Sequence, residues 1–162
     1  MRKIRNPFVN EPGYFCFGCC PTNPHGMHME FWQDGADVLA YWQPLEHFQG
    51  WGDILHGGVQ TALVDELGSW AVILTCQKAG VTFKLEMRFI KPISIKEERL
   101  TIRARVKETK RNIVIVESEI LDSQNAKCTE GLLYYYAFSA ETAPGNVRLP
   151  QMDALLEPES LA

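Results

Sequence analysis

One stretch of the chain, from His56 to Trp70, constrains the fold most strongly. It joins a His-Gly-Gly turn to a long apolar pattern with helical spacing. With a helical rotation of about 100° per residue, one broad apolar face contains Val59, Leu63, Leu67, Trp70 and Leu74. We therefore predict a helix from about Gly58 to Ala79, with Gly80 as its terminator.

Two carboxylates, Asp65 and Glu66, lie in the middle of this helical pattern. Burying a carboxylate without a partner costs free energy, so a core helix that carries two of them needs an explanation. On a helical wheel Glu66 falls at the centre of the apolar face. Asp65 falls at its edge, beside Thr61 and Ser69.

After the helix the pattern switches to a period of two, which is typical of strands. Two strands, 27–33 and 37–43, are predicted before the helix, joined by an Asp-Gly turn. Four long strands follow it, at 83–89, 100–107, 112–121 and 126–138. Consecutive strands with short turns form an antiparallel sheet, and only the helix can cover its face. We predict an α+β fold, a curved sheet of about five or six strands around one long helix.

The composition restricts the classes of function. The chain has 162 residues and a net charge of −4, so we expect one domain and no nucleic-acid partner. No apolar run reaches the length that spans a bilayer, and no secretory signal is recognised. Five cysteines without the density of a disulfide scaffold favour a cytoplasmic protein with reduced thiols. We predict an N-terminal loop segment at 1–26, a folded domain at 27–140 and a tail at 141–162.

Three motifs in this order resemble the hotdog-fold acyl-CoA thioesterases, and the phenylacetate-pathway type most closely. The first is the leader 16–27, which contains Cys-Phe-Gly-Cys and Asn-Pro-His-Gly-Met. The second is His56-Gly57-Gly58 with Asp65 nine residues after the histidine, and the third is Arg-Phe-Ile-Lys-Pro at 88–92. The resemblance covers roughly 16–140 and implies a hotdog fold, in a homodimer or a dimer of dimers.

The resemblance also implies the catalytic groups. The first glycine of the motif, Gly57, would polarise the thioester carbonyl through its N–H, since helix N-termini favour negative charge. Asp65 would be the nucleophile or the general base. His56 would orient the substrate or contact its carbonyl. Ser69, one turn after Asp65, would hold the attacking water or bond back to its own helix. Glu66 is a second candidate acid, with a pKa raised by its apolar surroundings, or it is paired at a subunit interface.

Further residues are predicted to bind substrate, namely Gln49, Gly58 and Thr82. Many relatives have an asparagine six residues before the histidine, where this chain has Gly50, so Gln49 is taken as the pocket amide. Cationic side chains at strand ends suit the CoA phosphates, although such residues are common on polar strand faces. They are Lys84, Arg88, Lys91, Arg103, Arg105, Lys107, Lys110 and Arg111.

The leader has two cysteines and two histidines, Cys16, Cys19, His25 and His28, with a spacing that resembles a zinc site. Since the segment resembles a metal-free leader of the family, we expect no metal, and no cofactor other than the CoA of the substrate. The predicted function is hydrolysis of an acyl-CoA thioester. The alternatives are a non-catalytic acyl-CoA-binding module and, less favoured by the loop pattern, an enoyl-CoA hydratase.

Overall fold

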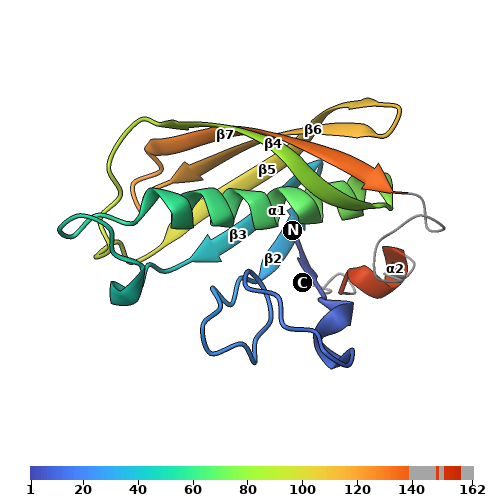
Figure 1. Cartoon of the computed structure of the whole chain (residues 1–162), viewed down its shortest axis with the longest axis horizontal. Helices are drawn as coiled ribbons and strands as arrows, with labels where there is room; N and C mark the ends of the chain where they lie inside the picture. Colours follow the sequence, from blue (N-terminus) through green and yellow to red (C-terminus); the bar gives the residue numbers. More distant parts are fainter. Residues whose placement is uncertain (139–148, 150–151, 158–162) are drawn as a thin grey trace.

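A single antiparallel sheet curves around one long helix in the computed structural model of this protein (Figure 1). The structure describes residues 1–138, 149 and 152–157. The strands are β1 (Arg2–Ile4), β2 (Phe31–Asp34), β3 (Asp37–Trp42), β4 (Ala79–Phe89), β5 (Leu100–Lys110), β6 (Ile113–Leu121) and β7 (Lys127–Phe138). The helices are α1 (Gly57–Cys76) and α2 (Met152–Leu155), with 3-10 turns η1 (Pro7–Asn10) and η2 (Glu46–Phe48).

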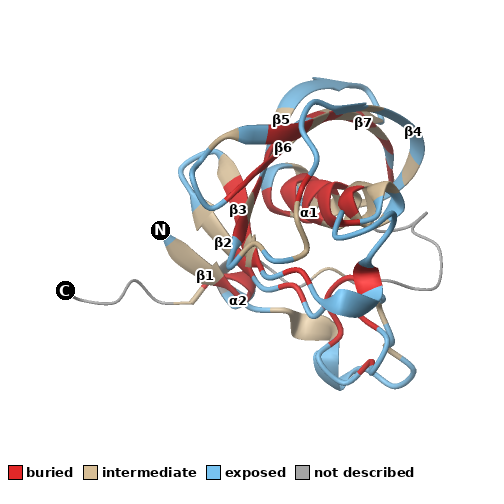
Figure 2. Ribbon diagram, turned by 90° about the vertical axis from the view of Figure 1, so that its left-hand side faces the viewer, coloured by how far each residue is buried: buried red, intermediate tan, exposed pale blue. Residues whose placement is uncertain are grey.

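The strands are ordered β1-β2-β3-β5-β6-β7-β4, so β4 lies at one edge of the sheet although it directly follows α1 in the chain. All of the neighbouring strands pair antiparallel. Figure 2 shows the buried residues gathered on α1 and on the strands around it. This confirms the predicted fold class and the single covering helix.

The sheet has seven strands rather than five or six, because the N-terminal segment adds one. Arg2 pairs with Gln33 and Ile4 with Phe31, so the prediction of a loop over 1–26 is wrong for β1. The first predicted strand is also shorter than expected, since β2 begins at Phe31. Before that point the N–H groups of Met27 and Met29 donate to carbonyls of the leader, at 2.8 and 2.9 Å, and not to a neighbouring strand.

The helix α1 ends three residues earlier than predicted. Gln77 takes the left-handed conformation, with φ of 53°, and its N–H donates to Ile73 O at 3.0 Å. Gly80 is already in β4 and is not the terminator. The left-handed conformation costs a non-glycine residue some free energy. At Gln77 this conformation occurs together with the hydrogen bond to Ile73 O that ends the helix.

The predicted tail at 141–162 lies mostly outside the described residues. Within it, α2 is described, and Leu155 and Leu156 are buried in the main core. Arg5 N donates to Leu155 O at 2.8 Å, and Glu157 N donates to Lys3 O at 3.0 Å, so this segment packs beside β1. No helix within the described ranges has the length and apolarity needed to span a bilayer.

Candidate active site

The N-terminus of α1 presents one free backbone donor. His56 is the N-cap, and its Nδ1 accepts from Gly58 N at 2.9 Å. Its carbonyl accepts from Val59 N and Gln60 N, at 3.0 and 3.1 Å. The N–H of Gly57 has no acceptor among the residues that the structure describes. Gly57 therefore has the donor that the proposed chemistry requires, whereas the N–H of Gly58 is already used.

A cleft of about 260 Å³ opens at this N-terminus. It is lined by Ile54, Leu55, Gly57, Gln60, Phe89, Ile90, Lys91 and Pro92. A Cβ on Gly57 would lie 3.5 Å from Cζ of Phe89, so the absence of a side chain keeps the cleft open against this ring. The cleft is mostly apolar, which suits an acyl group.

Gln60 is a residue of this region that the sequence reasoning missed. It is 4% exposed; its Nε2 donates to Leu55 O at 3.0 Å, and its Oε1 accepts from Thr129 Oγ1 at 2.5 Å. Both polar atoms are thus satisfied within the protein, which fixes the first turn of α1 against β7. The sequence contained a signal for this residue, because position 60 lies on the same face of the helix as the buried Leu63 and Leu67.

Asp65 is half-buried on the side of α1 that faces β4 and β7. Thr82 donates from Oγ1 to Asp65 Oδ1 at 2.7 Å, and Tyr135 donates from its hydroxyl to the same oxygen at 3.1 Å. The Tyr135 hydroxyl also lies 2.8 Å from the carbonyl of Asp65. The other carboxylate oxygen, Oδ2, has no hydrogen-bond donor within the described part of the chain, so it is available for chemistry.

Tyr135 was not predicted as a site residue, and Thr82 was expected to bind substrate. The structure places both against Asp65. Burial first, and then the negative charge of Asp65, raise the pKa of Tyr135 above its ordinary value, which keeps the hydroxyl protonated as a donor. Neutral donors hold a carboxylate in place without a cation beside it.

Glu66 faces a different environment from Asp65. Trp70 Nε1 donates to its Oε1 at 3.2 Å, and the thiol of Cys16 lies 3.5 Å from its Oε2. Burial, followed by the charge of Cys16, raises the pKa of Glu66 to about 7. Glu66 has the raised pKa that was expected, whereas Glu66 and Asp65 are both half-buried. The partners of Glu66 are Trp70 of the same helix and Cys16 of the N-terminal leader, and neither contacts the Asp65 carboxylate.

Ser69 donates from Oγ to Glu66 O at 2.8 Å, which is the bond back to its own helix that was one of its two predicted roles. Gln49 is exposed at the end of η2, and its side chain has no hydrogen bond among the described residues. A Cβ on Gly50 would lie 3.2 Å from Cα of His56. The close approach of these two backbones explains a glycine at this position.

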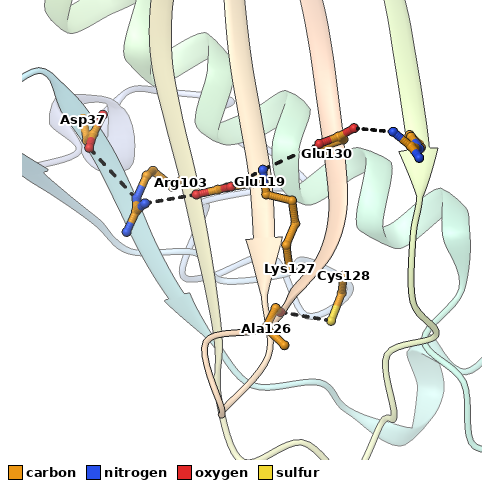
Figure 3. Close-up of polar contacts among 8 residues, drawn as sticks. Asp37, Arg103, Glu119, Ala126, Lys127, Cys128 and Glu130 are labelled. Carbon is orange, nitrogen blue, oxygen red and sulfur yellow. Dashed lines mark hydrogen bonds and ion pairs between the residues drawn. The ribbon is translucent and has the colours of Figure 1, made fainter.

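The cationic residues do not form a basic surface, because most of them alternate with acids across the sheet. Figure 3 shows Arg103 between Asp37 and Glu119, with Lys127 between Glu119 and Glu130. Further pairs are Arg105 with Asp37, Lys107 with Glu117, Arg88 with Glu130, Lys91 with Asp122 and Lys84 with Glu86. Six of the eight cationic residues are thus paired with an acid, whereas Lys110 and Arg111 form no ion pair within the described residues. Their predicted contact with CoA phosphates stays a prediction.

Comparisons with known proteins agree with this fold. Residues 52–129 match the family model of the thioesterase superfamily. A protein of Saccharolobus solfataricus, named "Putative esterase", is 39% identical over 82 residues, which are 50% of this chain and 53% of that protein. This chain thus spans about half the length of the curated relative that it matches.

Two solved structures illustrate the likeness. A thioesterase from Haemophilus influenzae is 23% identical, with a TM-score of 0.63 over 70% of this chain and 80% of that one. A hypothetical thioesterase protein from Streptococcus pneumoniae, solved with coenzyme A, is 16% identical, with a TM-score of 0.64 over 68% and 89% of the two chains. At these identities the likeness establishes the fold. The sheet, its central helix and the likeness to these structures show that this chain has a hotdog fold, and its residues 52–129 match the thioesterase superfamily.

Proposed function

We propose that this protein hydrolyses an acyl-CoA thioester to a free carboxylic acid and CoA. The observation that carries the proposal is the anchoring of Asp65, whose Oδ1 is held by Thr82 at 2.7 Å and Tyr135 at 3.1 Å. Its Oδ2 has no donor in the described residues. A carboxylate that is fixed in this way, half-buried and with one free oxygen, is suited to act on a substrate.

In the proposed reaction the carbonyl oxygen of the thioester accepts from the N–H of Gly57, which stabilises the negative charge that develops there. Asp65 then takes a proton from water, whose oxygen attacks the carbonyl carbon. In the nucleophilic version, Asp65 attacks the carbon itself and water later cleaves the resulting anhydride. Either way the bond from carbon to sulfur breaks, and CoA leaves as its thiol after protonation.

One chain cannot bring both groups to one carbonyl. Gly57 and Asp65 are eight residues apart on α1, which corresponds to about 12 Å along the helix axis. The N–H donor and a carbonyl oxygen must lie about 3 Å apart for a hydrogen bond. We therefore propose that the site forms between two copies, with Gly57 from one protomer and Asp65 from its partner.

The edge strand β4 is the surface that we propose for this pairing. It is 11 residues long and has a free edge opposite β7. Its exposed apolar side chains include Val81 at 51%, Phe83 at 56% and Leu85 at 38%. A long apolar edge is a template for pairing with another strand. Because Thr82 of β4 contacts Asp65, pairing of two β4 strands would place the candidate site at the new interface.

The carrier is proposed to be CoA. In support, the neighbour from Streptococcus pneumoniae was solved with coenzyme A, and one from Streptococcus mutans was bound to acetyl CoA. The chemistry of the cleft near Gly57 fits an apolar acyl group. The phenylacetate-pathway type and the cytoplasmic location stay predictions.

The test is a panel of acyl-CoAs, from acetyl to long-chain and including phenylacetyl-CoA, with detection of the released thiol. We expect turnover on at least one member and a loss of at least about 100-fold in kcat for Asp65→Asn. Asp34→Asn, an exposed acid at the end of β2, is the matched control and should keep the turnover of the unaltered protein. Full activity in Asp65→Asn would overturn the proposal. Tight binding of acyl-CoA without any thiol release would favour the binding module instead.

A further inference from the structure

The leader and the middle of α1 form a second cluster that the proposed reaction does not use. Cys16 and Cys19 of the leader meet Glu66 of α1, and one ligand atom from each lies within 4.8 Å of the other two. We propose that these three residues bind one zinc ion, which ties the N-terminal leader to α1. The proposal is independent of the proposed function.

The distances suit a small tetrahedral ion. The Sγ of Cys16 lies 3.5 and 3.6 Å from the two carboxylate oxygens of Glu66. In a tetrahedral site, a Zn–S bond of about 2.3 Å and a Zn–O bond of about 2.0 Å separate the two ligand atoms by roughly 3.5 Å. Thiolates with a carboxylate are a donor set that zinc accepts, whereas magnesium and calcium prefer oxygen alone.

The turn of the leader around Gly18 brings both cysteines against the carboxylate of Glu66. Cys19 is buried and Cys16 is half-buried. Gly18 permits the close approach, because a Cβ at this position would lie 2.3 Å from Cδ of Glu66. The turn therefore fits tightly around the carboxylate.

The cluster contains no positive charge of its own. Its other contacts are neutral: Trp70 with Glu66 at 3.2 Å, and Tyr14 and Asn6 with the sulfur of Cys19 at 2.9 and 3.4 Å. Across the described ranges, no Lys, Arg or His side chain forms an ion pair with Glu66. Buried anionic groups are paired or coordinate metals, and a divalent cation would supply the missing charge.

The two histidines of the leader are not the remaining ligands. His28 contacts Asn23 O through its Nε2 at 2.6 Å, and His25 is exposed. The spacing in the leader resembled a zinc site with two cysteines and two histidines as ligands. In the structure the candidate ligands are the two cysteines and Glu66, which lies 47 residues beyond Cys19 in the sequence. A fourth position is left for water. This revises the expectation of no metal, which rested on the leader alone.

The test begins with the full chain, reduced and stripped with a chelator, and titrated with Co²⁺ as a spectroscopic probe. We expect binding of one ion per chain, with a thiolate-to-cobalt charge-transfer band and the visible bands of tetrahedral cobalt, and displacement by Zn²⁺. In the unaltered protein, Zn²⁺ should also protect Cys16 and Cys19, but not Cys76, from an alkylating reagent, mapped by peptide mass spectrometry. This second measurement requires no variant.

Variants then assign the ligands. Cys16→Ser and Cys19→Ser should each lose about half of the charge-transfer intensity, and Glu66→Gln should weaken Co²⁺ binding by roughly tenfold or more. Cys20→Ser is the matched control, because Cys20 is buried in the same turn but contacts Thr22 and Tyr14 rather than Glu66. Circular dichroism checks that each variant is folded.

Three results would overturn the proposal. One is the absence of a thiolate band at stoichiometric Co²⁺. Another is equal alkylation of Cys16 and Cys19 with and without Zn²⁺. The last is a purified chain that retains no metal and has a disulfide between Cys16 and Cys19. The intact mass would show this disulfide as a loss of two hydrogens. It would identify the pair as a redox-active dithiol.

Discussion

Thr82 of β4 donates a 2.7 Å hydrogen bond from its hydroxyl to Oδ1 of Asp65 in α1, which links the candidate active carboxylate to the edge of the sheet. A register shift between Thr82 and Lys84 marks a bulge in β4 directly after this contact. Bulges are used near active sites to aim a side chain. The carboxylate is therefore positioned by the same strand that we propose to form the dimer.

Removing this hydrogen bond should lower the turnover. In Thr82→Val the side chain keeps its shape but cannot donate, and a hydrogen bond to a charged group contributes about 1.5–3 kcal/mol. We expect a decrease in kcat of about 10- to 100-fold, with a smaller change in KM. Steady-state kinetics checks this, with Thr82→Ser as the control that keeps the hydroxyl. Equal kcat values for Thr82→Val and Thr82→Ser would contradict it.

Two glycines of α1 should respond differently to alanine. At Gly57 the new Cβ would lie 3.5 Å from the ring of Phe89, an ordinary contact, so the free energy of unfolding should change by less than about 0.5 kcal/mol. The methyl group would enter the cleft, however, and we expect kcat/KM to fall roughly tenfold or more.

At Gly68 the Cβ would lie 2.3 Å from the hydroxyl of Tyr135. Because this hydroxyl is buried, the ring must shift, and we expect Gly68→Ala to lose about 1–3 kcal/mol of stability. Urea unfolding of the two variants distinguishes the cases. The interpretation fails if Gly57→Ala unfolds as easily as Gly68→Ala.

The proposed dimer can be tested on β4 itself. Leu85 is 38% exposed near the middle of this edge strand, and Leu85→Lys would place charges of the same sign on facing copies. We expect the chain to become a monomer and to lose hydrolysis while it keeps its circular dichroism. Val9→Lys, at an exposed apolar residue of η1, is the control that should leave the mass in solution unchanged. Sedimentation or light scattering measures this mass. A Leu85→Lys chain that remains dimeric and active would exclude this interface.

We expect the protein to lose stability in acid because of an ion pair at the hairpin between β6 and β7. Asp122 is buried, and its pKa is lowered by Lys91 at 2.6 Å and then by the N–H of Ala126 at 2.9 Å. The pKa of Asp122 is lower in the folded protein than in the unfolded chain. The ionised carboxylate therefore stabilises the fold at pH values above the ordinary carboxyl pKa. This stabilisation is lost as the pH falls through the pKa of the folded protein.

Urea unfolding between about pH 6 and pH 3 measures this contribution. In Asp122→Asn the dependence of unfolding free energy on pH should be flatter than in the unaltered protein. Lys91→Met removes the largest cause of the shift and should flatten it in part. An unchanged slope in Asp122→Asn would show that the acid sensitivity arises elsewhere.

The sequence by itself determined the elements and their faces. The change from a period of 3.6 to a period of two located α1 and the strands after it. In β4, however, the alternating apolar residues Phe83 and Leu85 are exposed, at 56% and 38%. The helical wheel also predicted different surroundings for Asp65 and Glu66, at the edge and at the centre of the apolar face. It also placed a free N–H at Gly57, since the first N–H groups of any helix lack partners within it.

Only the tertiary structure decided which side chains meet across the chain. Thr82 and Tyr135 reach Asp65 from β4 and β7, and Cys16 reaches Glu66 across 50 residues of sequence. The pairing of β1, and the cancellation of the cationic residues by acids on adjacent strands, likewise depend on strand order and register. Periodicity shows which residues share a face of an element but not what lies against that face, because long-range packing determines the contacts.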